Sequence, residues 1–259
     1  MVVFAGQGDA RRSMELLWGP RVVAPRTGPG PKPGLSVEAI VAAAIEIADA
    51  EGMAALSMRS VGERLGRTAM ALYTYVPGKT ELVDLMYDRA LAELPSSYSA
   101  SSGWRSAALA LADALWDLHL RHPWLLQVSP ARPVLGPGEF HVQETLLSVL
   151  SSTGLPLSRV RWVVSALFNI VRGSVQAAAE SRQAAAETGQ SEEDWWYARS
   201  ALLGELVPDL AGRFPTVARL GQEPVDAEEP YLEREARLSF EAGMEMLLDG
   251  VEAAIVRAG

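Results

Sequence analysis

Apolar residues recur at helical spacing along most of the chain after residue 35. In the first such segment they repeat at i, i+3, i+4 and i+7, which places them on one face of a helix. Its members are Val37, Ile40, Val41, Ala44, Ile45 and Ala48. Ser36 suits the N-cap of this helix, and Gly52 is expected to end it. Because the apolar residues seldom alternate with polar ones, the pattern predicts an all-helical protein.

Two much shorter helices follow and are separated by a glycine. The first is expected to begin at Ser57 and to end at Gly66, which suits a left-handed C-cap. The second is expected to be capped by Thr68 and to end before Pro77. Their inward-facing positions are Met58, Val61, Leu65, Leu72 and Val76. Three helices with a glycine turn between the last two form a helix-turn-helix.

Longer helices are predicted for the rest of the chain. Their expected ranges are 80–94, 102–122, 138–152, 156–187, 191–207 and 230–257. Ser191 followed three residues later by Asp194 is a variant of the capping box. Two segments read as loops, 129–138 and 208–230, and the second of them is acidic.

The segment before the first long helix has a different composition. Residues 19–34, GPRVVAPRTGPGPKPG, hold five prolines, four glycines, three cations and no acid, so they cannot pack a core. We favour a solvated linker over an arm that contacts nucleic acid, although basic arms do enter minor grooves. We therefore predict a flexible basic arm at 1–34, which includes a short amphipathic turn at 11–18. A helix-turn-helix domain at 35–80 and a larger helical domain at 81–259 follow.

Charge is distributed unevenly between these parts. The chain has 259 residues and a formal net charge of -9, yet residues 1–80 carry nine Lys and Arg against seven Asp and Glu. The remaining residues carry fourteen cations against twenty-five acids. Because fields from distant charges are screened beyond about 8 Å at physiological salt, the basic end can still approach a polyanion.

Composition also excludes several classes of chemistry. The chain has no cysteine, which excludes disulfides, thiol nucleophiles, zinc-thiolate sites and iron-sulfur clusters. No window approaches the ~20 apolar residues of a membrane span, and the N-terminus lacks a signal peptide, so we expect a cytoplasmic protein without a membrane partner. His119, His122 and His141 could share a metal with Asp117 or Glu144. We favour ordinary helix-end histidines and predict no metal or other cofactor.

The residues around the glycine turn carry a family resemblance. The stretch SMRSVGERLGRTAMALYTYVPGKTELVDLM resembles the DNA-binding domain of the TetR family of bacterial transcriptional repressors, and the likeness covers about residues 35–94. Its markers are Leu56, Val61, Leu65, Gly66, Leu72, Tyr73, Tyr75, Val76, Lys79, Glu81 and Leu82. GPKPGLS and FEAGMEMLLDGVEA (240–253) resemble the subgroup closest to the tetracycline repressor.

The short helix after the glycine turn then becomes a candidate recognition helix. Leu72 and Val76 anchor it while its other face is free to meet DNA. The Arg59 guanidinium can bind guanine O6 and N7. The resemblance implies phosphate contacts from Tyr73, Tyr75 and Lys79. The predicted DNA-binding residues are Arg59, Arg67, Thr68, Ala69, Met70, Ala71, Tyr73, Tyr75 and Lys79.

Each of these assignments has a simpler alternative. Arg59 and Arg67 could be solvated surface cations, and the Tyr73 ring could pack against the first helix with only its hydroxyl exposed. The sequence also departs from the tetracycline repressor, because a base-reading glutamine is replaced by Ala69 and the next proline and threonine by Met70 and Ala71. We therefore expect a different operator.

The larger domain offers candidate residues for an effector. The helix at 156–187 has a polar stripe that is either solvent-facing or lines a pocket, and the two interpretations are equally supported. The stripe and three side chains from other helices make up the candidate effector residues. The stripe consists of Trp162, Ser165, Asn169, Arg172 and Gln176, and the other three are Trp116, His119 and Phe140.

The last helix offers a candidate dimer interface. Its candidate interface residues are Phe240, Met244, Leu247, Leu248 and Val251. Gly243 and Gly250 would let a partner backbone come close, and the alternative is that this face belongs to the intramolecular core. We favour dimerisation, because one short recognition helix reads too few bases.

Together these features predict a one-component transcriptional regulator. The resemblance implies a homodimer that represses from a palindromic double-stranded DNA operator and is released by an unidentified small-molecule effector, although the response could be reversed. A helical ligand-binding protein without operator binding is one alternative. An enzyme that uses the larger domain is another, but the sequence lacks a nucleophile-base pair and a phosphate loop, so we predict no catalytic residues.

Overall fold

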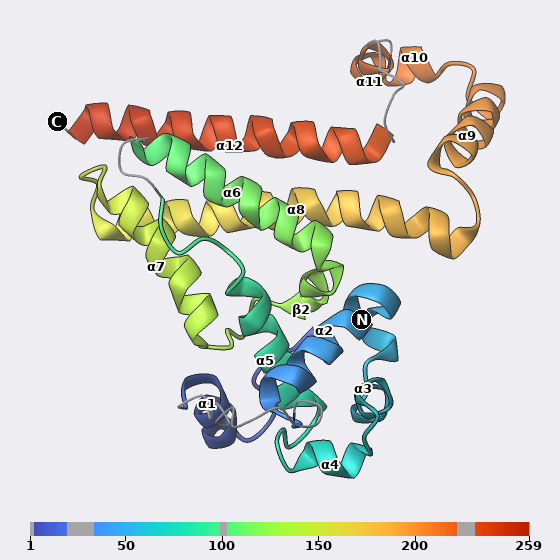
Figure 1. Ribbon diagram of the computed structural model, residues 1–259. Coiled ribbons are helices and arrows are strands. Elements are labelled where there is room, and N and C mark those ends of the chain that lie inside the picture. Colours follow the sequence, from blue (N-terminus) through green and yellow to red (C-terminus); the bar gives the residue numbers. More distant parts are fainter. Residues whose placement is uncertain (1–2, 20–33, 99–102, 222–230, 259) are drawn as a thin grey trace. The chain divides into compact units, whose positions relative to one another are not determined.

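The computed structural model describes residues 3–19, 34–98, 103–221 and 231–258, which are almost entirely helical (Figure 1). The α-helices are α1 (Ala10–Trp18), α2 (Val37–Ala55), α3 (Met58–Leu65), α4 (Ala69–Tyr73), α5 (Lys79–Leu91), α6 (Gly103–Arg121), α7 (Pro137–Ser151), α8 (Leu157–Thr188), α9 (Glu192–Leu206), α10 (Leu210–Arg213), α11 (Pro215–Leu220) and α12 (Tyr231–Ala258). A 3-10 helix, η2 (Pro123–Gln127), follows α6. The two-residue strands β1 (Val3–Phe4) and β2 (Val128–Ser129) pair in parallel. The all-helical fold class is confirmed, and none of the described helices is long and apolar enough to cross a bilayer.

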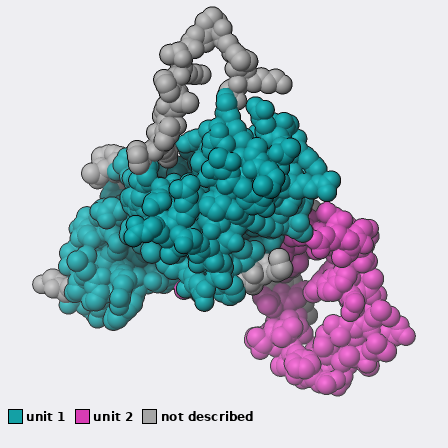
Figure 2. Space-filling model, turned by 90° about the horizontal axis from the view of Figure 1, so that it is seen from below, with its two compact units in different colours: residues 1–168, 247–259 teal, residues 169–246 magenta. Residues whose placement is uncertain are grey.

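The chain divides into two compact units, which Figure 2 colours separately. The first unit comprises residues 1–168 and 247–259, and the second comprises residues 169–246. The helix-turn-helix therefore shares the first unit with α5, α6 and α7, whereas α9, α10 and α11 belong to the second and α8 and α12 contribute residues to both. The boundaries predicted at residues 34 and 80 divide the chain by function, into an arm, a DNA-binding domain and a larger domain. This division stays a prediction.

Most of the predicted helix ends agree with the structure because local side chains fix them. The Ser36 hydroxyl accepts the Ala39 N–H at 3.2 Å at the start of α2. Gly52 is non-helical, with φ 76°, and kinks α2 where an end was expected. Gly66 ends α3 in the left-handed conformation, with φ 65°.

Two capping predictions were only partly right. Thr68 occupies the N-cap of α4, but its side chain makes no capping hydrogen bond. The Ser191 hydroxyl accepts the Asp194 N–H at 3.0 Å, whereas the reciprocal bond of a capping box is not formed.

Two other predictions were wrong. Residues 1–34 are not a flexible arm throughout, because Val3–Phe4 form β1 and Ala10–Trp18 form α1, which Asp9 caps; the turn predicted at 11–18 lies within α1. Within the predicted loop at 208–230, α10 and α11 are helical, and Pro215 takes the first turn of α11, where a missing N–H is tolerated. The proline-rich residues 20–33, predicted to be a linker, lie outside the described residues.

Candidate nucleic-acid interface

The candidate recognition helix α4 has one buried face, which anchors it, and one exposed face, which points outward. Leu72 and Val76 are completely buried, whereas Met70 is 74% exposed and Tyr73 is 44% exposed. The helix ends at Tyr73, and the N–H groups of Tyr75 and Val76 both donate to the Leu72 carbonyl at 2.9 Å. This turn buries Val76 although it lies beyond the helix. The outward side chains are thus free to reach a groove while the buried ones hold the helix.

The turn between α3 and α4 depends on a close backbone approach at Gly62. A Cβ on Gly62 would lie 2.8 Å from the Arg67 carbonyl oxygen and 3.2 Å from the Ala69 nitrogen. The Arg67 N–H donates to the Gly62 carbonyl at 2.8 Å. Only glycine fits this position without moving the turn, and the sequence analysis missed it. The available signal was a glycine inside a short helix, where glycine is otherwise unfavourable.

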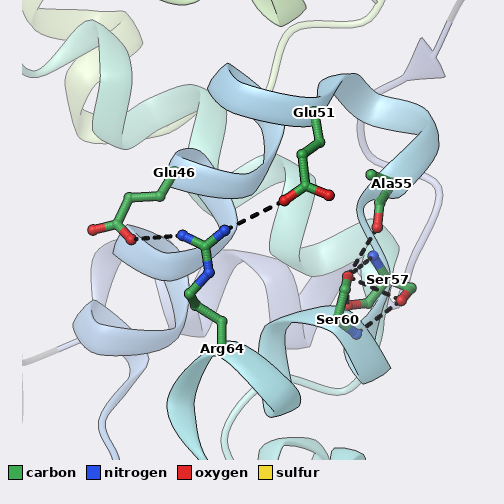
Figure 3. A network of polar contacts seen from close by, with 6 residues as sticks. All are labelled: Glu46, Glu51, Ala55, Ser57, Ser60 and Arg64. Carbon is green, nitrogen blue, oxygen red and sulfur yellow. Dashed lines mark hydrogen bonds and ion pairs between the residues drawn. The ribbon is translucent and has the colours of Figure 1, made fainter.

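A polar network holds α3 against the end of α2 (Figure 3). Ser57 and Ser60 form a reciprocal capping box, and the Ser60 hydroxyl also lies 2.9 Å from the Ala55 carbonyl oxygen. Farther along α3, the Arg64 guanidinium lies 3.3 Å from both Glu46 and Glu51 of α2. These ion pairs are partly exposed and contribute little energy each, but they hold the Arg64 guanidinium beside α2.

Arg59 also lies on α3 but takes no part in this network. Its side chain is 85% exposed. Its Nε lies 2.8 Å from Glu63 Oε1, and this hydrogen bond raises the pKa of the guanidinium. Glu63 engages only Nε, so the two Nη groups remain available to donate to a base. Arg67 and Thr68 are also exposed, while Ala69, Ala71 and Tyr75 are half-buried.

Lys79 has a structural contact that the sequence analysis did not foresee. Its ammonium donates to the Leu56 carbonyl at 2.6 Å and to the Met53 carbonyl at 3.3 Å. Lys79 thereby satisfies carbonyls at the end of α2 and ties that end to the start of α5. Its predicted phosphate contact remains a prediction.

His122, which is itself buried, belongs to a polar cluster that joins α2 to η2. The ring Nδ1 lies 2.8 Å from Asp49 Oδ1, and Nε2 lies 3.4 Å from Glu93. The Trp124 indole N–H donates to the same Asp49 oxygen at 2.8 Å. These partners give the histidine a structural role, and among the described residues no cluster of histidines and carboxylates is arranged to hold a metal.

The predicted effector residues do not come together. Trp116 is 4% exposed and lies in the core, whereas Phe140 is 47% and Trp162 is 61% exposed. His119 is half-buried, with Nδ1 2.7 Å from the Leu115 carbonyl oxygen. Along α8 the side chains of Ser165, Asn169 and Gln176 are exposed and Arg172 is half-buried. Of the two interpretations of this stripe, the structure favours the solvent-facing one.

A cleft lies elsewhere, between the first turns of α6 and the outer face of α7. Its volume is about 540 Å³, and none of the eight predicted effector residues lines it. Tyr98, Trp104, Glu144, Thr145 and Ser148 are among its lining residues. The Tyr98 hydroxyl is buried without a hydrogen-bond partner among the described residues, and burial raises the pKa of this phenol. A buried hydroxyl of this kind is costly until a ligand or water pairs with it.

The predicted dimer face of α12 is mostly internal. Phe240, Met244, Leu248 and Val251 are each at most 3% exposed, and Leu247 is half-buried, so a partner cannot reach most of this face. The intramolecular alternative is correct for these residues. A Cβ on Gly243 would lie 3.1 Å from Ile170, so this glycine admits α8 of the same chain.

Comparisons with known proteins agree with the helix-turn-helix geometry. A family model described as bacterial regulatory proteins, tetR family, matches residues 40–86. A second, described as tetracyclin repressor-like, C-terminal domain, matches residues 99–255. The HTH-type transcriptional repressor DrrR1 of Streptomyces coeruleorubidus is 36% identical over 256 residues, which are 98% of this chain and 89% of that protein.

Another relative and a solved structure extend this agreement. An HTH-type transcriptional regulator of Saccharopolyspora erythraea is 32% identical over 220 residues, which are 83% of this chain and 89% of that protein. The structure of the Streptomyces coelicolor protein ActR in complex with actinorhodin is 25% identical, with a TM-score of 0.67, and the match covers 86% of this chain and 99% of that one.

Proposed function

The chain belongs to the TetR family of bacterial regulatory proteins, and from this premise we propose how it binds DNA and responds to a ligand. It is a DNA-binding transcriptional repressor that a small-molecule effector releases from a palindromic operator. We assign the operator contacts to the outward face of α4 and to Arg59. The observation that carries this assignment is the division of α4 between buried Leu72 and Val76 and exposed Met70 and Tyr73. Because operator DNA is cytoplasmic, the protein acts there.

Arg59 is proposed to read a base, and its removal tests that role. Arg59→Ala is expected to weaken operator binding by about 1–3 kcal/mol and to relax the preference at one base pair in each half-site. Tyr73→Phe removes a phosphate contact and is expected to weaken binding to all sequences equally. Fluorescence anisotropy with labelled duplexes from the DNA that flanks the gene measures both effects.

Arg64→Gln is the matched control for this experiment. It removes a cation from the same helix, but Arg64 pairs with Glu46 and Glu51 of α2. We expect it to leave base preference unchanged. If Arg64→Gln and Arg59→Ala altered preference equally, the assignment of base reading to Arg59 would be incorrect.

The effector is proposed to bind the cleft between α6 and α7. Trp104 offers an aromatic surface, Glu144 a carboxylate, and Tyr98 a buried hydroxyl without a partner among the described residues. These groups suit an aromatic ligand with polar substituents, and the similarity to ActR bound to actinorhodin supports a ligand of that class. Mass spectrometry of the purified protein can identify a retained molecule.

Homodimerisation is proposed to use the exposed face of α12 in place of the buried one. Small and apolar side chains recur on that face at helical spacing. They are Ala242, Met246, Gly250, Ala253 and Val256. Met246 is 74% and Val256 is 76% exposed, so both add apolar area to this face, and extended apolar patches mark protein-interaction sites.

Gly250→Glu tests this dimer face. A Cβ at Gly250 meets no atom within 4 Å in the single chain and the residue is exposed, so the fold is expected to tolerate the substitution. In the dimer it would bury a charge, so we expect a monomer in light scattering and operator binding weakened at least tenfold. Glu245→Gln, on the same helix, is the control and should remain dimeric. A dimeric Gly250→Glu protein would exclude this face.

A further inference from the structure

Residues 3–18 form an ordered segment that neither family match includes. The two matches cover residues 40–86 and 99–255, whereas β1 and α1 lie before both. We call residues 3–18 the N-terminal strap. All of the strap's contacts described below lie within the first compact unit.

The strap binds two buried carboxylates of α5. The Gly6 N–H donates to Asp84 Oδ1 at 3.0 Å, and the Asp9 N–H donates to Glu81 Oε1 at 3.2 Å. Asp84 is 2% exposed and Glu81 is 7% exposed. A side chain at Gly8 would collide with the Glu81 carboxylate, so the backbone of the strap lies directly on it. Since a buried carboxylate is costly without hydrogen bonds, these N–H groups hold strap and helix together.

The strap also binds the segment from β2 to the start of α7. Strand β1 pairs with β2, with Val3 opposite Val128 and Phe4 opposite Ser129. At its other end, the Trp18 indole N–H donates to the Leu135 carbonyl at 2.8 Å. The Trp18 ring centroid lies 5.9 Å from that of Phe140. The strap therefore contacts residues 128–140 at both of its ends.

Helix α5 lies between these contacts and the recognition helix. Its first residue, Lys79, binds carbonyls at the end of α2, and it follows α4 after a short turn. Two turns later, Asp88 accepts the Glu139 N–H of α7 at 3.0 Å. Glu81, Asp84 and Asp88 are spaced as one helix face, and each accepts an N–H from another segment. The angle of α5 thus depends on the strap and on α7 together.

We propose that the N-terminal strap is a positioning element for operator binding, which holds α5, and through it α4, at a fixed angle to residues 128–140. The proposal rests on the proposed function, because its consequence is read in DNA affinity. A chain without the strap keeps the DNA-contacting side chains but has to order α5 on binding. It should therefore bind the same operator less tightly.

The first test removes residues 2–18 from the full-length protein. We expect the truncated protein to melt cooperatively and to bind the operator about tenfold more weakly, which is within the usual range of coupling between distant sites. The slope of log K against log salt should stay the same, because positioning adds no phosphate contact. An unchanged affinity would overturn the proposal. A shallower slope would overturn it as well, because it would mean that the strap binds DNA itself.

Point variants separate the strap's contacts from its charge. Trp18→Ala removes the bond to Leu135 and the ring contact, and Trp18 is 52% exposed, so the fold should tolerate the change even if the truncated chain does not. We expect a smaller loss of affinity than in the truncated protein, because the contacts of Gly6, Asp9 and β1 remain, with partial recovery in Trp18→Phe. The double variant Arg11→Ala, Arg12→Ala leaves the backbone contacts in place and should bind as the parent does. If Trp18→Ala bound the operator as tightly as the parent does, the strap would have no positioning role.

Hydrogen exchange tests the strap without DNA. In the truncated protein, amides of residues 79–91 should exchange about tenfold faster than in the parent, since the hydrogen bonds from Gly6 and Asp9 to α5 are lost. Equal exchange would contradict the proposal even if the parent bound no operator. Failure of the parent to bind DNA, with faster exchange in the truncated protein, would instead count against the proposed function alone.

Discussion

Replacing Gly62 with alanine is expected to abolish specific operator binding. The new Cβ would lie 2.8 Å from the Arg67 carbonyl oxygen and 3.2 Å from the Ala69 nitrogen, and both are backbone atoms that no rotamer change can move. The turn would have to shift, which displaces the first residue of α4 directly. Overpacking of this kind costs about 1–3 kcal/mol of stability. We expect operator affinity to fall more than a hundredfold in anisotropy titrations, because both protomers of a dimer carry the defect.

The control for Gly62→Ala is the same substitution in open space. Gly173 lies in α8, and a Cβ there meets no atom within 4 Å. Gly173→Ala should therefore melt at the same temperature as the parent or higher, since alanine favours the helix by about 1 kcal/mol. If Gly62→Ala behaved in the same way and kept its operator affinity, the close approach of α3 and α4 would not be needed for binding.

Leu72→Ala and Met70→Ala are expected to have opposite consequences although they are two residues apart. Leu72 is completely buried, so its truncation leaves a cavity and costs about 2–5 kcal/mol of stability. A helix of five residues has little stability of its own, so α4 should detach and operator binding should be lost. Met70 is 74% exposed, and Met70→Ala should change stability by less than about 0.5 kcal/mol.

The readout for this pair combines denaturant melts with binding to an operator and to a one-base variant of it. We expect exposed Met70 to make an apolar contact with a thymine methyl, so Met70→Ala should retain binding but discriminate less at a thymine. Leu72→Ala should bind neither duplex. A destabilised Met70→Ala protein, or a stable and binding-competent Leu72→Ala protein, would show that the two faces of α4 are assigned the wrong way round.

The helix-turn-helix was predictable because its determinants are local in sequence. Ser57 caps α3 and Gly66 adopts the left-handed conformation that was expected of it. Leu72 and Val76 are buried, as their spacing indicated. Capping and positive φ depend on neighbours within a few residues, so a single sequence contains the information.

Features that depend on distant contacts were missed or misassigned. The periodicity of Phe240 and Met244 identified a buried face of α12, but it could not show whether the same chain or a second copy covers that face. The spacing of the polar stripe on α8 was compatible with a pocket as well as with a solvent-facing side. Only the structure shows that Ser165, Asn169 and Gln176 are exposed. The strap was missed because Gly6 and Asp84, which it joins, are 78 residues apart.

Lys79 and His122 show the same limit for charged groups. Lys79 was predicted to contact phosphate from the family resemblance, whereas its bonds to the Met53 and Leu56 carbonyls join residues 26 and 23 positions apart, which local patterns cannot reveal. His122 was considered as a metal ligand because of its spacing from His119. Its carboxylate partners, Asp49 and Glu93, come from α2 and from the residues after α5.

The most direct test of the account is a nuclease footprint of the unmodified protein on the DNA that flanks its gene. We expect two protected half-sites of one palindrome with centres about 34 Å apart or a small multiple of that, as a dimer with two recognition helices requires. Protection should weaken steeply as salt is raised. Absence of any protected palindrome at low salt would contradict the account and favour a helical ligand-binding protein without operator recognition.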